Sequence, residues 1–287
     1  MSGTTVTLTG TGVPTAHPAT AGPGALVRCG GTALQFDAGR ATTLRLAEAG
    51  VQPQDLTAVF ITHQHSDHLT GLADVVLTRW LTRGVAPLPV IAPRGACTRF
   101  VERLLDVWDD DIAIRMAHTG RPDRPGYEVV GFEPTSDPAV VWSEGDIRVS
   151  AVAVHHEPVT PSVAYRIDTP DGATVVSGDT RVCAEVADLA RGAKVLVHEA
   201  CRVDALRPFG PPGSDLGHIL DYHADTIALG ELAKLAEVET LVLTHLIPPL
   251  RGAADADAFE ADVRAGGFDG TVVVGRDLDS VDLGSDA

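Results

Sequence analysis

Cysteine is scarce in this chain, and its positions exclude two kinds of small structural site. Four cysteines are spread over 287 residues and form no Cys-x-x-Cys pair: Cys29, Cys97, Cys183 and Cys201. A zinc knuckle or a disulfide scaffold needs closely and regularly spaced cysteines, so neither is indicated. We expect buried free thiols in a reducing compartment.

Basic residues are also few. The chain has 22 Lys and Arg against 39 Asp and Glu, which gives a formal net charge of −17. This balance opposes binding of a polyanion, and Lys and Arg occur only singly or in scattered pairs. A nucleic-acid partner is therefore not expected, although an acidic balance is also common in soluble proteins of ordinary function.

Targeting and membrane signals are missing from the sequence as given. The first residues, Met1 to Thr4, are not a basic segment followed by an apolar one, and no apolar stretch approaches the length of a membrane span. We expect a cytoplasmic protein without a membrane partner.

The composition is that of an ordinary globular protein, with 44% hydrophobic and 21% charged residues. A chain of this length can bury a large core without disulfides. We expect a single domain over residues 1–287, made of two similar halves at about 1–135 and 136–287.

The segment from His63 to His68 is the densest group of potential ligands in the chain. It holds three histidines and one aspartate directly after the apolar run 58–61, and a helix-like stretch from Leu69 to Gly84 follows it. Imidazole and carboxylate groups suit Zn²⁺ and similar ions, and the spacing of His63 and His65 points both rings to one side of an extended backbone. A histidine-rich surface turn is the alternative, but four ligands in six residues between a strand and a helix favour a metal site.

Three further potential ligands stand at the ends of apolar strands downstream. His156 ends the β-branched stretch that begins at Ile147, Asp179 follows the apolar run 173–176, and His245 ends the strand 240–244. His155 ends the same strand as His156, and because adjacent residues face opposite sides of a strand, only one of them is expected to be a ligand.

The pattern His63-x-His65-x-Asp67-His68, followed in order by His156, Asp179 and His245, resembles that of the metallo-β-lactamase superfamily. The resemblance implies an α/β fold, the four-layer αββα sandwich of that family. It also implies two Zn²⁺ ions, with manganese and iron compatible with the same ligands. Each ion has three ligands of its own and Asp179 bridges; the first set is His63, His65 and His156, and the second is Asp67, His68 and His245.

The choice of His156 over His155 rests on the continuation from Pro158 to Arg166, which matches the family pattern after that ligand. His155 either supports the site, lines the pocket or is an ordinary polar residue. Asp37 and the pair His198-Glu199 are expected to support the ligands from behind, and the role of His218 is open.

His223 resembles a histidine that the ribonuclease Z and arylsulfatase-like branch carries as a group other than a ligand. With Asp67, it completes the expected catalytic residues. A protonated imidazole there, oriented by Asp221 or Asp225, would protonate the leaving oxygen or stabilise charge. The alternative is a histidine at a helix end without a chemical role. The ligand pattern implies a hydrolase that uses a metal-bridging hydroxide.

The substrate does not follow from the fold, because enzymes with this fold cleave many kinds of bond. We expect a small-molecule ester, either a phosphodiester, a sulfate ester or a lactone. A ribonuclease Z-type tRNA 3′-processing endonuclease is the alternative. It is disfavoured by the charge and by the short interval between His156 and Asp179, where common ribonuclease Z enzymes carry a tRNA-clamping arm.

A regulatory metal-binding protein without catalysis is a third reading. It is the weakest, because all seven expected ligands and His223 are present in the sequence. A homodimer is left open.

Overall fold

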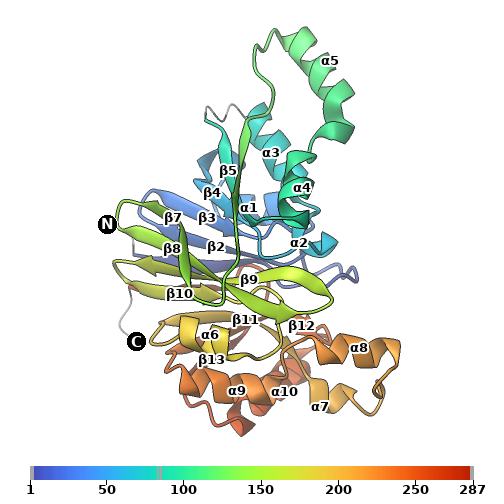
Figure 1. Ribbon diagram of the computed structural model, residues 1–287, viewed down its shortest axis with the longest axis vertical. Coiled ribbons are helices and arrows are strands. Elements are labelled where there is room, and N and C mark those ends of the chain that lie inside the picture. Colours follow the sequence, from blue (N-terminus) through green and yellow to red (C-terminus); the bar gives the residue numbers. More distant parts are fainter. Residues whose placement is uncertain (1–2, 83, 85, 285–287) are drawn as a thin grey trace.

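Two seven-stranded sheets pack face to face in the computed structural model, which describes residues 3–82, 84 and 86–284 (Figure 1). The first sheet has the strand order β14-β1-β2-β3-β4-β5-β6: β14 (Ser280–Asp282), β1 (Thr5–Gly10), β2 (Gly24–Cys29), β3 (Thr32–Phe36), β4 (Ala58–Phe60), β5 (Leu88–Pro93) and β6 (Tyr127–Phe132). The second has the order β13-β12-β11-β10-β9-β8-β7: β13 (Thr271–Val274), β12 (Thr240–Ile247), β11 (Val195–Cys201), β10 (Gly172–Val176), β9 (Val159–Thr169), β8 (Ile147–His156) and β7 (Ala139–Glu144).

The two sheets share one pattern of strand directions. In the first, β3 to β6 run parallel and β1 and β2 are antiparallel; in the second, β10 to β13 run parallel and β7 to β9 are antiparallel. Parallel neighbours need crossover connections, and helices supply them on the outer faces.

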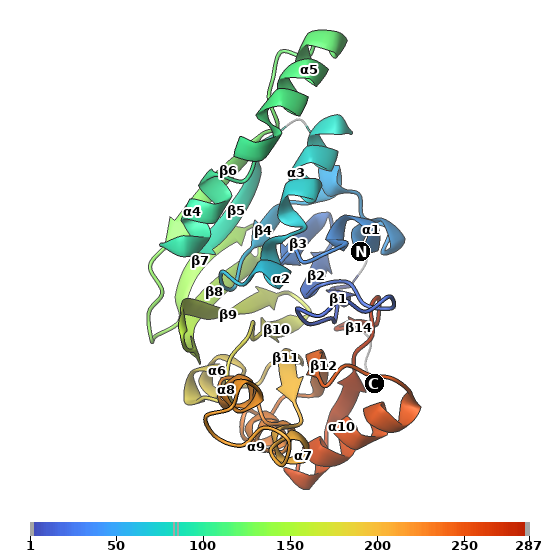
Figure 2. The same cartoon turned by 90° about the vertical axis from the view of Figure 1, so that its right-hand side faces the viewer.

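Helices cover the outside of each sheet, so the molecule has four layers (Figures 1 and 2). On the first half they are α1 (Thr42–Glu48), α2 (Ser66–Leu69), α3 (Leu72–Leu81), α4 (Ala96–Glu102) and α5 (Asp109–Thr119), with short 3-10 turns at Pro53–Asp55 and Asp106–Trp108. On the second half they are α6 (Ala184–Leu189), α7 (Val203–Leu206), α8 (Asp215–Asp221), α9 (Thr226–Leu235) and α10 (Ala253–Ala265).

Three apolar cores hold these layers together. The central core lies between the sheets, where Phe36 and Phe60 stack with centroids 4.8 Å apart and Tyr165 of the second sheet packs against both. One outer core joins the first sheet to α1, α3 and α4, and the other joins the second sheet to α6, α9 and α10. The αββα sandwich expected from the sequence is confirmed.

Several element boundaries differ from those expected. The stretch from Leu69 to Gly84 is not one helix, since α2 ends at Leu69 and α3 begins at Leu72 after a break at Gly71. No helix was expected after Trp108, where the structure has α5, which projects from the body of the sandwich (Figure 1).

The structure also bears on the expectations about the cysteines and about membrane spans. All four cysteines are free; Cys97 and Cys201 are buried, whereas Cys29 and Cys183 are half-buried. Among the described helices, none has the length and apolar character needed to cross a membrane.

Candidate metal centre

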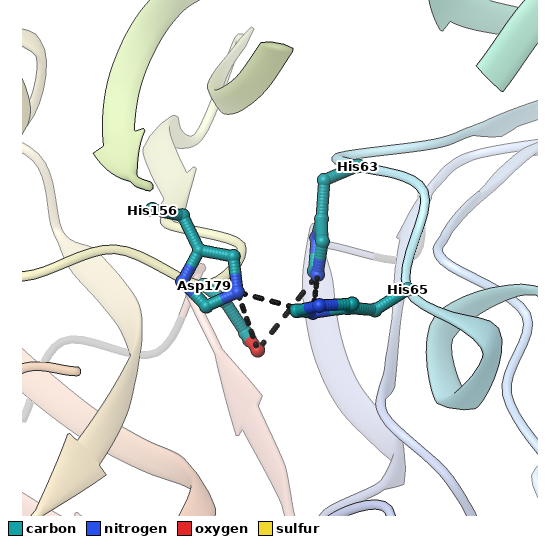
Figure 3. Close-up of side chains that lie close together, drawn as sticks. All are labelled: His63, His65, His156 and Asp179. Carbon is teal, nitrogen blue, oxygen red and sulfur yellow. Dashed lines mark hydrogen bonds and ion pairs between the residues drawn. The ribbon is translucent and has the colours of Figure 1, made fainter. Parts of the chain in front are cut away.

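The potential ligands gather at one edge of the sandwich because several strands end there. In the second sheet β8, β10, β11 and β12 run in the same direction, so their carboxyl ends share an edge. Segment 61–65, which follows β4 of the first sheet, meets them there (Figure 3). Ligand sites of open α/β sheets commonly lie at the carboxyl ends of strands.

His63, His65, His156 and Asp179 form the first cluster, with one ligand atom from each side chain within 4.8 Å of all the others. His65 Nδ1 lies 3.0 Å from His63 Nε2 and 3.1 Å from His156 Nε2. Figure 3 shows two of these rings coming from the segment after β4 and the third from the end of β8. The first expected ligand set is therefore brought together.

Asp67, His68 and His245 form the second cluster, and all three side chains are buried. Asp67 Oδ2 lies 3.4 Å from His245 Nε2 and 3.7 Å from His68 Nε2. Asp67 and His68 belong to α2, the turn of helix that directly follows the first two histidines. The second expected set is also brought together.

Asp179 lies between the two clusters. Its Oδ1 is 3.3 Å from His68 Nε2, and its Oδ2 is 3.4 Å from His245 Nε2 and 3.8 Å from His156 Nε2. Burial alone would raise the pKa of Asp179, but the neighbouring His245 and His68 outweigh it and hold that pKa well below its ordinary value. This position suits a carboxylate that is shared between two ions.

Asp37 supports both clusters from behind. Its Oδ2 accepts hydrogen bonds from His68 Nδ1 at 2.7 Å and from the Thr62 hydroxyl at 2.7 Å, while its Oδ1 accepts from Thr62 N at 2.8 Å. The Thr62 oxygen in turn accepts from His63 Nδ1 at 3.0 Å. These bonds leave Nε2 of His63 and His68 free to face the cluster, as partners behind a metal ligand do.

Two of the histidines stand at β-bulges, which aim them at the edge. The pairing of β8 with β9 shifts between Val154 and His156, and that of β11 with β12 skips His245. His245 also has a φ of 45°, in the left-handed region that non-glycine residues seldom adopt. Bulges and uncommon backbone conformations occur preferentially at functional sites, where they redirect a side chain.

The donor set fits divalent cations. His156 Nδ1 donates to the carbonyl of Tyr222 at 3.3 Å, so its Nε2 lone pair faces the first cluster. The N–N contacts of 3.0 and 3.1 Å are close to the separation of roughly 3.3 Å expected for nitrogens that bind Zn²⁺ tetrahedrally. In the second cluster, buried His68 Nε2 makes no hydrogen bond with the described residues and lies 3.3 Å from Asp179 Oδ1, as neighbouring ligand atoms would.

The pKa values of the histidines follow from the same environment. Burial, followed by the nearby His68, lowers the pKa of His63 well below its ordinary value. Burial is also the largest cause of the lowered pKa values of His65 and His156. These three rings are therefore neutral at pH 7, which is the form that binds metal ions.

His223 forms a buried ion pair beside the clusters. Both carboxylate oxygens of Glu199 lie 2.9 Å from His223 Nδ1, and they also accept from Thr180 N at 2.8 Å and Ala224 N at 3.2 Å. Burial would lower the pKa of His223, but the charge and hydrogen bond of Glu199 outweigh it and raise the pKa to about 9. His223 is therefore protonated at neutral pH.

The partner of His223 differs from the expected one. Asp225 caps α9 by accepting from Ile227 N and Ala228 N, and Asp221 pairs with Arg207 at 2.9 Å. The expectation that one of them orients His223 is wrong, because Glu199 of β11 holds His223 Nδ1 at 2.9 Å. A strand that ends in an acidic residue was the signal available in the sequence.

The remaining histidines lie outside both clusters. His155 lies between Glu157 and Glu185, at 3.3 and 3.2 Å, and belongs to neither cluster. His198 is buried behind the site, with Nδ1 bonded to the carbonyl of Glu199. His218 is exposed on α8 and lines the hollow in front of His65 and His156.

Comparison with known proteins gives the same family as the motif. A family profile described as "Beta-lactamase superfamily domain" matches residues 28–246. A protein named Ribonuclease Z from Mycobacterium bovis is 37% identical over 282 residues, which cover 97% of this chain and 98% of the relative. Another Ribonuclease Z, from Mycolicibacterium gilvum, is 36% identical over 281 residues and covers 97% of this chain and 96% of that one.

Solved structures support the fold. The metallo-β-lactamase fold protein YhfI from Bacillus subtilis superposes with a TM-score of 0.71 at 20% identity, over 97% of this chain and 99% of that one. The short form of human tRNase Z gives a TM-score of 0.69 at 21% identity, over 97% and 99% of the two chains.

The relatives correct one expectation from the sequence. Proteins named Ribonuclease Z match this chain over almost its whole length, and the names describe an enzyme that acts on RNA. The expectation of a small-molecule ester as partner, with nucleic acid unlikely, is therefore wrong, and the relatives favour the alternative given with it. It failed because the net charge of a whole chain does not report the charge around one site.

Fold, motif and relatives agree: the chain belongs to the metallo-β-lactamase superfamily and is a metal-dependent hydrolase of ester bonds.

Proposed function

We propose that this protein is a binuclear metal-dependent endonuclease of the ribonuclease Z type, which cuts a phosphodiester bond near the 3′ end of a tRNA precursor. The observation that carries the proposal is the 37% identity to a protein named Ribonuclease Z over 97% of this chain. The paired His and Asp clusters and the buried His223–Glu199 pair support it.

The proposed ligands are the seven residues of the two clusters. His63, His65 and His156 would hold one ion, and Asp67, His68 and His245 would hold the other, with Asp179 shared. We propose Zn²⁺ in both positions because imidazole-rich sets suit it, with Mn²⁺ and iron as competing ions. When bound, a pair of divalent ions supplies Lewis acids for the phosphoryl oxygens and activates a water for attack.

The protein's own side chains then have separate tasks. Asp37 and the carbonyl of Tyr222 fix the orientation of the histidine rings by accepting from their Nδ1 atoms. His223 carries the proton that the departing ribose oxygen needs, and Glu199 keeps that proton on His223 at neutral pH. Asp67 would help to hold the second ion together with His68 and His245.

The short interval between His156 and Asp179 is compatible with this function. It holds only β9, a turn and β10. The relatives named Ribonuclease Z are matched over 96 to 98% of their own length by this chain, so the name does not require an additional long segment.

The test is cleavage of a tRNA precursor that carries a 3′ trailer, with the metal content measured on the same sample. We expect two ions per chain and a single cut near the trailer junction. His223→Ala should keep both ions and lose roughly 10²- to 10⁴-fold in rate, the usual contribution of a proton donor.

His118→Ala is the matched control, since His118 is exposed on the projecting α5 and lies outside both clusters. Full cleavage by His223→Ala would contradict its role as proton donor. Two bound ions without cleavage of any tRNA precursor would contradict the proposed substrate.

A further inference from the structure

A second hollow lies on the metal-centre edge of the sandwich, and we call it the basic pocket. It has a volume of about 320 Å³ and lies between residues 11–20, which follow β1, and residues 246–252, which follow His245. The segment 275–277 completes its wall. Leu246 lines the pocket and directly follows His245 of the second cluster in the sequence, so the pocket lies next to that cluster.

Two arginines at this pocket have no partner for their charge. Arg251 and Arg276 are exposed, and within the described residues neither side chain forms an ion pair or a hydrogen bond. Arginines elsewhere, such as Arg45 and Arg202, are paired with carboxylates at 2.8 and 2.6 Å. In a chain of net charge −17, two unpaired guanidinium groups therefore lie at one hollow.

The acidic side chain in the lining does not cancel this charge. Asp277 Oδ1 accepts from the backbone N and the hydroxyl of Thr11, at 3.0 and 2.9 Å. Its Oδ2 accepts from Ala21 N at 2.7 Å and pairs with Arg45 at 2.8 Å. Both oxygens are thus occupied from behind. The carboxylates of Asp255 and Asp279 accept from the backbone N of Arg251 and Arg276, at 2.7 and 2.8 Å, so within the described residues the two guanidinium groups stay unpaired. His17 lines it as a further polar group.

The same bonds make the pocket rigid. Asp277 ties the segment after β1 to the segment after β13, and Gly12 N donates to Ala21 O at 2.9 Å across the loop. A Cβ on Gly10 would lie only 1.8 Å from Gly22 O, so the two sides of this loop touch through their backbones. A preformed wall lowers the entropy cost of binding a ligand.

The inner surface of the pocket is partly apolar. Pro249 and Leu250 are half-buried and line it together with Ala19. An apolar surface with guanidinium groups around it matches a nucleotide, since the sugar or base covers the apolar part and the phosphates bind arginine. A free inorganic anion would leave the apolar part exposed to water.

We propose that the basic pocket binds the single-stranded RNA backbone beside the scissile bond, through Arg251 and Arg276. This inference rests on the proposed function, because it assigns a subsite to the RNA substrate. It also explains how a chain of strongly negative charge holds a polyanion at the metal centre.

The test is direct binding of a fluorescently labelled tRNA precursor to the full-length holoprotein, measured by anisotropy at several salt concentrations. The variants are Arg251→Gln, Arg276→Gln and the double variant. Arg148→Gln is the matched control, because Arg148 is also exposed and unpaired but lies at the start of β8, the end opposite to His156. Metal content and melting temperature are measured for every variant to verify the fold.

We expect each variant at the pocket to raise the Kd roughly 3- to 10-fold, and the double variant to raise it further. The slope of log Kd against log salt should become shallower by roughly 0.7 to 1 for each arginine removed. A Kd and a salt slope equal to those of Arg148→Gln would overturn the proposal.

The outcomes separate this proposal from the proposed function. RNA cleavage with binding that does not depend on Arg251 and Arg276 keeps the function and overturns the pocket. Arginine-dependent binding without cleavage supports the pocket and contradicts the function. An absence of RNA binding by the unmodified protein overturns both.

Discussion

Glu199 acts on the reaction only through His223, so its effect should be seen in the pH dependence. Glu199→Gln keeps the size and a hydrogen-bond acceptor but removes the charge that raises the pKa of His223 to about 9. A histidine with a raised pKa holds its proton below that value and loses it as the pH rises through it. We therefore expect the alkaline limb of kcat/KM to move to lower pH by about one unit or more in the variant.

Rates of RNA cleavage between pH 6 and pH 10 check this prediction. Glu185→Gln is the control, because Glu185 also pairs with a histidine, at 3.2 Å, but that histidine is His155 outside the clusters. A lower rate with an unchanged alkaline limb would mean that Glu199 only maintains the local structure.

His245 combines an expected ligand with an uncommon backbone conformation, and one substitution separates the two properties. Asparagine tolerates the left-handed region, where His245 has a φ of 45°, but it is a much weaker ligand than imidazole. We expect His245→Asn to keep the fold and to bind one ion per chain in place of two, with nearly all turnover lost. Metal analysis after exhaustive dialysis measures this, and retention of two tightly bound ions would remove His245 from the ligand set.

At the scale of elements, the turn that carries Asp67 and His68 depends on backbone contact with its neighbour. A Cβ on Gly71 would lie 2.0 Å from Gly39 O and 3.0 Å from Ala38 O. We expect Gly71→Ala to push α2 and α3 away from the backbone of residues 38–39, with a loss of about 1–3 kcal/mol in the free energy of unfolding. Metal affinity should fall with it, because α2 holds two of the proposed ligands.

Gly31→Ala is the matched control, since an added Cβ there meets no atom within 4 Å and the φ of Gly31 is not positive. Chemical denaturation of both variants, followed by circular dichroism, gives the comparison. Equal stabilities would show that the turn relaxes around the added methyl group.

The elements also show what the sequence could and could not predict. Ligands at or just after apolar strands were predictable, because an apolar run lies one to three residues before each of Asp179 and His245. Helix α5 was not, since Ile112 is its only buried residue and gives no apolar stripe, although the acidic first turn from Asp109 to Asp111 is a start signal.

The site was predictable in its residue types and less so in its geometry. The motif predicted seven metal ligands, and the structure brings these seven residues together. The bulges at His156 and His245 depend on the register between strands that are distant in sequence, which no local pattern encodes. The pairing of Glu199 with His223 likewise depends on how β11 meets the residues before α9.

At the scale of the whole molecule, we propose that the two halves, about 1–135 and 136–287, unfold as one domain. The central core is built from both sheets, with Phe36 and Phe60 on one side and Tyr165 on the other, and Tyr165 also donates to Ile61 O at 2.7 Å. Neither half can keep this surface buried alone. We expect one calorimetric transition, and two separated transitions would contradict the proposal.

Metal removal should shift that transition without splitting it. A ligand that binds only the folded state adds about 2.7 kcal/mol when present at 100 times its Kd. We therefore expect EDTA to lower the melting temperature and Zn²⁺ to restore it. An unchanged melting temperature after verified metal loss would mean that the clusters contribute nothing to stability.

The division of ligands between the sheets also has a consequence for the order of synthesis. His63, His65, Asp67 and His68 follow β4, whereas His156, Asp179 and His245 come from the second sheet. A nascent chain that has just completed β6 thus carries only part of each set, and His245 is the last of the seven residues to be synthesised. Binding of the two proposed ions should therefore be complete only after β12 has been synthesised. A polypeptide truncated before β12 would lack one member of the second set.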